Sequence, residues 1–225
     1  MLIRRSVHAG IGAVLVVLAA AGCAGSGGGE SAKPAAQILS DAEAAAQAAD
    51  SVHISGTVAQ GGGAAPGAAT ATINLVLTSS GDGREQINGA GQNIDLIKVG
   101  QVLYLKGLTA PGANAGYQRL AVTDPRAAPL VAQLDKKTVF DQLVKSGSAP
   151  SITGKDTVAG QAAVKISPGG GVGVLYVADD PAHPYPLKVE TAPAGGAAPA
   201  GPAGALMFTD WNAHTTITAP PNGGN

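Results

Sequence analysis

The stretch VGQVLYLKG, residues 99–107, decides the fold. It places a turn at residues 99–101 before a short strand whose residues 102–105 are apolar on both faces. A strand of an antiparallel sheet that packs on one side only would alternate apolar and polar residues. Residues 75–77 and 96–97 show the same two-sided pattern. We therefore expect an antiparallel sheet with both of its faces covered.

Strands of this kind fill much of the chain on either side of that stretch. Turn-like residues at Gly81-Asp82-Gly83 and at 99–101 separate short runs rich in Ile, Val, Leu and Thr, which predicts antiparallel hairpins. The strands are expected at 52–58, 70–80, 84–89, 93–100, 101–107, 152–158, 161–167, 172–178, 187–191, 206–211 and 215–218.

Three segments show helical spacing instead. Residues 34–50 begin near a proline and are rich in alanine, with apolar residues recurring at helical intervals. Two shorter helices are expected at 126–135 and from Thr138 to about residue 147. Strands, then helices, then strands again indicate an α+β fold with a large antiparallel sheet.

The composition excludes several classes of protein. Charged residues make up 13% of the 225 residues, and the formal net charge is −1, which is not the basic balance of a nucleic-acid-binding protein. The only cysteine is Cys23, so a disulfide framework within the chain and multi-cysteine metal sites are excluded.

The first residues have the layout of an export signal. Arg4 and Arg5 precede an apolar run that is shorter than a comfortable membrane span, and small residues follow it. The run ends in Ala20-Ala21-Gly22-Cys23, which resembles the bacterial lipobox. We expect residues 1–22 to be a lipoprotein signal peptide, cleaved between Gly22 and Cys23, with Cys23 carrying the lipid. An ordinary cleaved signal with an incidental cysteine, and an uncleaved anchor, are the alternatives.

The remaining chain divides by composition. Residues 23–33 are expected to form a flexible Gly/Ser-rich tether, residues 34–220 the folded domain, and residues 221–225 a disordered tail. Two Gly/Ala/Pro-rich stretches, 61–69 and 192–204, are expected to be loops.

A search for catalytic and metal-binding motifs returns little. The chain contains no Gly-x-Ser-x-Gly elbow and no His-Glu-x-x-His pair. The glycines at 169–173 open a strand, whereas a phosphate-binding loop precedes a helix. Asp179, Asp180 and His183 lie in a segment with turn chemistry. We expect no enzyme activity, no metal site and no cofactor, although an exported hydrolase stays a third interpretation because catalytic groups can meet in space alone.

Four segments together resemble one protein family. They are residues 99–107, Thr123-Asp124-Pro125 before two short helices, 154–160, and the closing segment 206–212 with 216–220. Their order is similar to that of the LppX/LprA/LprF/LprG-type mycobacterial lipoproteins. The long loops at 61–69 and 192–204 depart from that pattern.

The resemblance implies a strongly curved antiparallel sheet, a half-barrel, with helices packed on its concave face. It also implies that acylated lipid or lipoglycan binds in a hydrophobic cavity and is moved to the cell envelope. We accordingly expect a protein held by its acyl anchor on the extracytoplasmic face of the cell membrane, monomeric, with a possible membrane transporter as partner and no nucleic acid.

The residues that would line such a cavity come from the apolar strands and helices. A structural or interaction domain with a filled core is the alternative, and a register error of one residue would invert the face assignment. Trp211 is expected to anchor the closing strand rather than to touch a ligand. The expected lining residues are Ile73, Leu75, Leu77, Leu96, Leu103, Leu105, Leu130, Leu134, Phe140, Leu143, Val174 and Tyr176.

Overall fold

The computed structural model describes residues 29–59, 69–89, 91–107, 116–144, 149–169, 173–191 and 204–221. The expected signal peptide, Cys23 and nearly all of the two Gly/Ala/Pro loops lie outside these residues, as does the tail from residue 222 onward.

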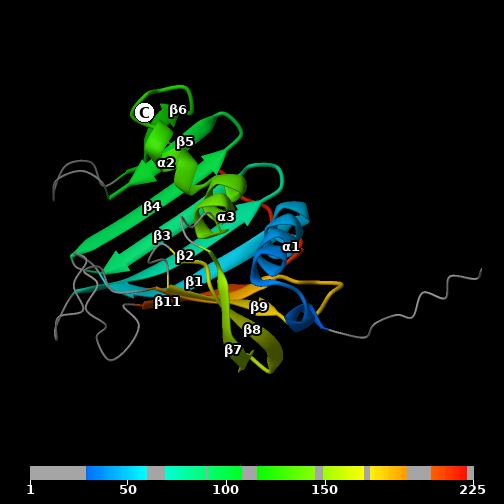
Figure 1. Ribbon diagram of the computed structural model, residues 1–225. Coiled ribbons are helices and arrows are strands. Elements are labelled where there is room, and N and C mark those ends of the chain that lie inside the picture. Colours follow the sequence, from blue (N-terminus) through cyan, green and yellow to red (C-terminus); the bar gives the residue numbers. More distant parts are fainter. Residues whose placement is uncertain are drawn as a thin grey trace, which may run out of the picture.

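The described residues form one curved, open antiparallel sheet of eleven strands (Figure 1). The strand order is β6-β5-β4-β3-β2-β1-β11-β10-β9-β8-β7. The chain therefore builds one meander from β1 to β6 and a second from β7 to β11, and the closing strand β11 returns to pair with β1. The bounds are β1 Ser51–Ala59, β2 Thr70–Thr78, β3 Gly83–Gly89, β4 Gln92–Val99, β5 Val102–Lys106, β6 Gln118–Ala121, β7 Ser151–Val158, β8 Gln161–Ser167, β9 Gly173–Ala178, β10 Pro186–Thr191 and β11 Gly204–Thr209.

The three predicted helices are present in the described residues. They are α1 Ala35–Ala48, α2 Ala128–Gln133 and α3 Lys136–Val144. Ile38, Ala42 and Ala46 recur every four residues in α1, and all three are fully buried. Asp135 caps α3 by accepting hydrogen bonds from the backbone N–H and the hydroxyl of Thr138, at 2.7 and 2.6 Å.

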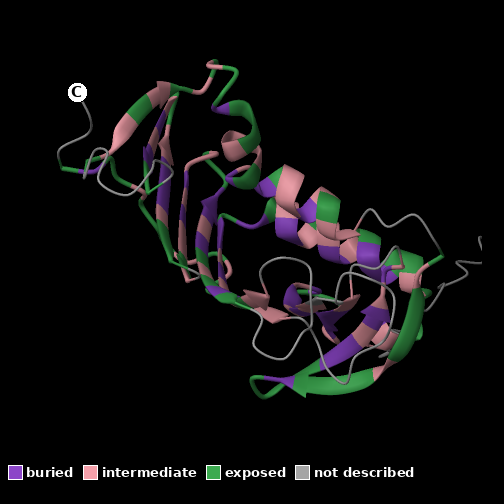
Figure 2. Cartoon of the chain, turned by 90° about the vertical axis from the view of Figure 1, so that its left-hand side faces the viewer, coloured by how far each residue is buried: buried purple, intermediate pink, exposed green. Residues whose placement is uncertain are grey.

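All three helices pack against one face of the sheet, which we call the helix-covered face (Figure 2). Side chains alternate between the two faces of a strand, so the register tells which residues share this face. Ile54 of β1 lies opposite Leu75 of β2 and Phe208 of β11, and all three join the cluster that contains α1 and α3. The opposite, open face carries a second, smaller cluster around Tyr176, Ala163 and Leu187.

Three features differ from the sequence-based expectation. Strand β6 was not predicted, and it forms because β5 offers its free edge to residues 118–121. Residues 215–218 form no strand, and Trp211 lies just beyond β11, because the backbone turns into the left-handed region at Asp210 and Asn212.

The start of the described chain also differs from the expectation of a free tether. Residues Glu30–Ala32 form a 3₁₀-helix in which Glu30 is fully buried. Side-chain hydrogen bonds hold this turn on the domain, as described below, so the predicted tether of residues 23–33 does not extend through residues 29–33.

Candidate ligand-binding cavity

A cavity of about 500 Å³ lies between the helix-covered face and the helices α2 and α3. Its volume falls within the ~300–1,000 Å³ that small-molecule sites occupy. Most of the wall is aliphatic or aromatic. The residues that line it are Ile54, Ile73, Leu75, Glu85, Pro129, Ala132, Gln133, Val139, Gln142, Leu143, Val189, Leu206 and Phe208.

Five neighbouring strands form the floor of the cavity. In sheet order they are β3, β2, β1, β11 and β10, which contribute Glu85, Ile73 with Leu75, Ile54, Leu206 with Phe208, and Val189. Neighbouring strands lie about 4.8 Å apart, so the floor extends roughly 19 Å across the sheet. The helices α2 and α3 supply the remaining lining residues and form the roof.

A glycine keeps the middle of this floor free of side chain. Gly56 of β1 lies opposite Ile73 on one side and Leu206 on the other, and both of these line the cavity. A Cβ atom at Gly56 would come within 1.9 Å of the carbonyl oxygen of Ala205. The close approach of β1 and β11 therefore requires glycine at this position.

Glu85 is the one titratable residue among the described residues that line the cavity. Its exposed fraction is 7%, and its Oε2 atom has no hydrogen-bond partner among the described residues. Burial raises the pKa of the Glu85 carboxyl above its ordinary value, because the surrounding apolar groups disfavour the charged form. The cavity thus combines an apolar wall with one buried polar group.

An aromatic cluster lies beside β11, next to the lining residue Phe208. Trp211 stacks on Tyr185 with a centroid distance of 4.6 Å and an interplanar angle of 12°. Its indole N–H donates to the carbonyl of Pro186 at 3.2 Å. Phe140 and Phe208 lie 5.6 and 6.5 Å from the same ring. The structure thus places Trp211 as a packing anchor beside the lining residue Phe208.

The structure separates the twelve predicted lining residues into three groups. Ile73, Leu75 and Leu143 line the cavity. Val174 and Tyr176 lie with the second cluster on the open face, because the register puts Leu175 and Val177 on the helix-covered face. Their assignment to the lining is therefore wrong. The others belong to the packed core around the cavity: Leu77, Leu96, Leu103, Leu105, Leu130, Leu134 and Phe140.

Sequence reasoning missed several lining residues. The missed strand residues lie on β1, β11 and β10: Ile54, Leu206 with Phe208, and Val189. Only the long-range pairing of these strands shows that they share a face with Leu75. Glu85 could not be predicted from apolar patterning, because its side chain is charged. Gly83, Glu85 and Ile87 alternate along β3 and so share one face of the strand. This alternation is the sequence signal that could have identified Glu85.

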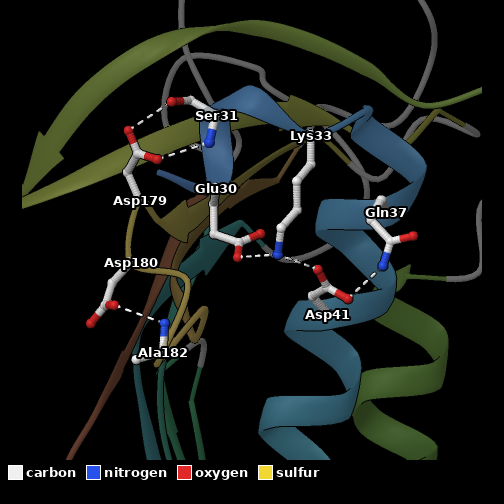
Figure 3. Close-up of polar contacts among 8 residues, drawn as sticks. All are labelled: Glu30, Ser31, Lys33, Gln37, Asp41, Asp179, Asp180 and Ala182. Atoms are coloured by element: carbon white, nitrogen blue, oxygen red, sulfur yellow. Dashed lines mark hydrogen bonds and ion pairs between the residues drawn. The ribbon is translucent and has the colours of Figure 1, made fainter. Parts of the chain in front are cut away.

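The acidic turn considered as a metal site is engaged in other contacts. Asp179 accepts hydrogen bonds from the backbone N–H and hydroxyl of Ser31, at 2.8 and 2.9 Å (Figure 3). Asp180 accepts a hydrogen bond from the backbone N–H of Ala182, and its carboxylate contacts His183. Within the described ranges, no group of three His, Cys, Asp or Glu residues is arranged to hold a metal ion.

Ion pairs hold the first described residues against the domain in the same region. Lys33 lies between the carboxylates of Glu30 and Asp41, at 2.5 and 2.6 Å, and Gln37 donates to Asp41 (Figure 3). These contacts join the 3₁₀-helix to the first turns of α1.

His53 forms no catalytic relay with its neighbours among the described residues. His53 contacts both Asp210 and Thr209 through the same ring nitrogen, Nδ1, at 3.3 and 3.4 Å. A relay needs the nucleophile and the carboxylate on different ring nitrogens.

In the part of the chain that the structure describes, no helix is long and apolar enough to cross a bilayer.

Comparison with known proteins identifies the fold. No family model matches the chain, and no curated protein matches its sequence. The crystal structure of LprF from Mycobacterium bovis is similar with a TM-score of 0.50 and 18% identity, over 86% of this chain and 99% of LprF. The lipoprotein LppX from Mycobacterium tuberculosis has a TM-score of 0.49 and 11% identity, over 81% of this chain and 97% of LppX.

The similarity to LprF spans nearly the whole of both domains and agrees with the resemblance found in the sequence motifs. At 18% identity, this similarity is one of fold. The chain has the fold of the mycobacterial LppX/LprF-type lipoproteins.

Proposed function

We propose that this protein is a lipoprotein of the cell envelope that binds acylated lipid or lipoglycan in its cavity and assists the transport of that lipid. The observation that carries the proposal is the apolar cavity of about 500 Å³ between the sheet and the helices α2 and α3. Removing apolar surface from water contributes a favourable free energy of about 25 cal/mol per Å². An acyl chain can therefore bind there without a charged partner.

The fold supports this assignment. In the proposal, the helix-covered face is the inner, concave side of a half-barrel, and the helices act as its cover. A cover of short helices can shift relative to the sheet more readily than a closed barrel can open, which suits the loading and release of a long apolar ligand.

The sequence before the described residues supplies the anchor in this proposal. Residues 1–22 act as the signal peptide, and Cys23 carries the acyl chains that hold the domain on the extracytoplasmic face of the membrane. Two or more acyl chains give stable anchoring. The domain acts as a monomer, and a membrane transporter is the partner with which it would exchange lipid.

A lipid-anchored structural or interaction domain is the second candidate. The packing of Leu77, Leu96 and Leu103 favours it, because these expected lining residues are almost completely buried in a filled core. The cavity of about 500 Å³ lies between β10 and β3, and its occupation by lipid distinguishes the two functions.

Mass spectrometry of organic extracts tests the proposed function. Purified full-length protein is expected to release acylated lipid in a fixed ratio to protein. Extracts that contain no lipid beyond the protein's own acyl anchor would favour the filled structural domain.

A further inference from the structure

The cavity wall contains a buried carboxyl oxygen for which the described residues provide no partner. Glu85 lies in the middle of β3, directly between Leu75 on β2 and Leu96 on β4. Both neighbours are apolar and buried, and the Oε2 atom of Glu85 is buried without a hydrogen bond among the described residues. Such an atom is unfavourable in a folded protein unless something satisfies it.

The charged groups nearest in the fold are already engaged. Lys98 shares the helix-covered face with Glu85, but its ammonium donates to the carbonyl of Gly81. Arg84 lies on the open face, where it binds the carboxylate of Asp95 through two nitrogens, at 2.8 and 3.1 Å. Helix α2 contains no titratable residue.

The lysines of α3 are also occupied. Lys136 donates to the backbone carbonyls of Gln47 and Ala49, and Lys137 pairs with Asp141 at 2.7 Å. None of these charged side chains on β3, β4 and α3 is therefore positioned as a partner for Glu85. The missing hydrogen-bonding group is expected from the ligand.

Polar side chains line the cavity on β3 and on the two helices of its roof: Glu85 is buried, whereas Gln133 and Gln142 are exposed. The backbone of Leu134 lies over Gly83, which places the end of α2, and with it Gln133, above the part of β3 that carries Glu85. On β11 and β10, away from Glu85 in the sheet order, the lining residues are Leu206, Phe208 and Val189, all apolar. A ligand with one polar end and one long apolar chain matches this arrangement.

We propose that Glu85 binds the hydroxyl group of an uncharged acyl lipid whose chain extends along the cavity toward β10; this inference rests on the proposed function. A hydroxyl both donates and accepts, so it can satisfy the carboxyl whether or not the carboxyl is ionised. An ester carbonyl only accepts, and a buried ammonium would bring a second desolvated charge. The raised pKa of Glu85 supports an uncharged partner.

Two probes with the same acyl chain test the inference. They are 1-monooleoylglycerol, which has hydroxyl groups, and methyl oleate, which has none. Binding to purified full-length protein is followed by the fluorescence of Trp211, the only tryptophan, which lies 6.5 Å from the lining residue Phe208. The wild-type protein is expected to bind 1-monooleoylglycerol about tenfold more tightly than methyl oleate.

Two substitutions assign this preference to the carboxyl group. Glu85→Met keeps the length of the side chain but removes both oxygens, and it is expected to abolish the tenfold preference without weakening methyl oleate. Glu85→Gln keeps a donor and an acceptor, and it is expected to retain most of the preference. Should Glu85→Met fail to fold, Glu85→Leu is measured in its place, and loss of the preference in Glu85→Leu with its retention in Glu85→Gln is again the expected result.

The outcomes separate this inference from the proposed function. Equal affinities for the two probes in the wild-type protein, or an unchanged preference in Glu85→Met, would overturn the role of Glu85 and leave lipid binding intact. Tighter binding of oleylamine than of 1-monooleoylglycerol would overturn the assignment to an uncharged lipid. Binding of no probe at all would overturn both proposals.

Discussion

Ser31 donates two hydrogen bonds to Asp179, from its backbone N–H at 2.8 Å and from its hydroxyl at 2.9 Å, although 148 residues separate them in the sequence. Lys155 of β7 adds a contact to the same carboxylate at 3.3 Å. The three groups fix the first described turn of the chain against the end of β9. The fold therefore fixes the position of Ser31 and the turn that contains it.

Removal of this carboxylate should release the start of the chain. Asp179→Ala is expected to lower the free energy of unfolding by about 1–2 kcal/mol, because two hydrogen bonds to a charged group are lost. Amide hydrogen exchange at Ser31 should become faster. The matched control is Asp180→Ala, which removes contacts only within its own turn. Equal exchange at Ser31 in the wild-type protein and Asp179→Ala would contradict this account.

Asp95 on the open face should make the protein sensitive to acid. Burial by itself raises the pKa of Asp95, but hydrogen bonds from Arg84 and Tyr117 outweigh it, and the pKa is lowered from 3.8. The stabilisation is therefore complete above pH 3.8 and is lost as the pH falls through the lowered pKa. Asp95→Asn is expected to lower the free energy of unfolding by about 1–2 kcal/mol at neutral pH.

Urea unfolding curves over a pH series check this prediction. The difference between Asp95→Asn and the wild-type protein should shrink as the pH falls below 3.8. A difference that stays constant over that range would show that the Asp95 contacts do not depend on its charge.

Glu85 should produce a pH dependence of the opposite sign. Its pKa is raised in the folded state, so folding is favoured most below its ordinary value of 4.5, and that stability is lost as the pH rises through the raised pKa. Glu85→Gln is expected to lack this decline. Glu85→Met should raise the free energy of unfolding at neutral pH by about 1–3 kcal/mol, because an unpartnered carboxyl is removed. A destabilised Glu85→Met would instead indicate a structural role for the carboxyl.

Gly56 should tolerate no side chain. Gly56→Ala is expected to lower the free energy of unfolding by about 1–3 kcal/mol, because the new Cβ atom would meet the backbone of Ala205 and force β1 and β11 apart. Gly116→Ala is the control, since a Cβ atom there would have nothing within 4 Å. Thermal unfolding of the two variants compares them, and similar melting temperatures would argue against the close approach of the strands.

Most strands and all three helices could be predicted from local sequence. The period of the apolar residues changes from helical to alternating at Ser51, where β1 begins, and the alanine-rich stretch before it forms α1. Strand β6 could not be predicted, because residues 118–121 form a strand only through pairing with the edge of β5. The β-branched residues at 215–218 have strand propensity but pair with no strand among the described residues, and propensity alone does not form a ladder.

The cavity was harder to predict than the fold. Its floor depends on which faces of β10 and β11 join those of β1 and β2, and these strands are distant in sequence. Val174 and Tyr176 were predicted to line the cavity but lie on the opposite face of β9. The prediction was off by one residue of register, because Leu175 between them faces the helices. Glu85 shows a further limit, because a charged residue gives no apolar signal even where it is buried.

The most direct test of the central claim is to fill the cavity. Ala132 of α2 lines it, whereas Ala128, one turn earlier on the same helix, is exposed and does not. Full-length wild-type protein, Ala128→Trp and Ala132→Trp are purified side by side, and their bound lipid is quantified by mass spectrometry of organic extracts. We expect wild-type protein and Ala128→Trp to carry equal amounts of acyl lipid and Ala132→Trp to lose most of it. Equal amounts in all three proteins would contradict lipid binding in this cavity.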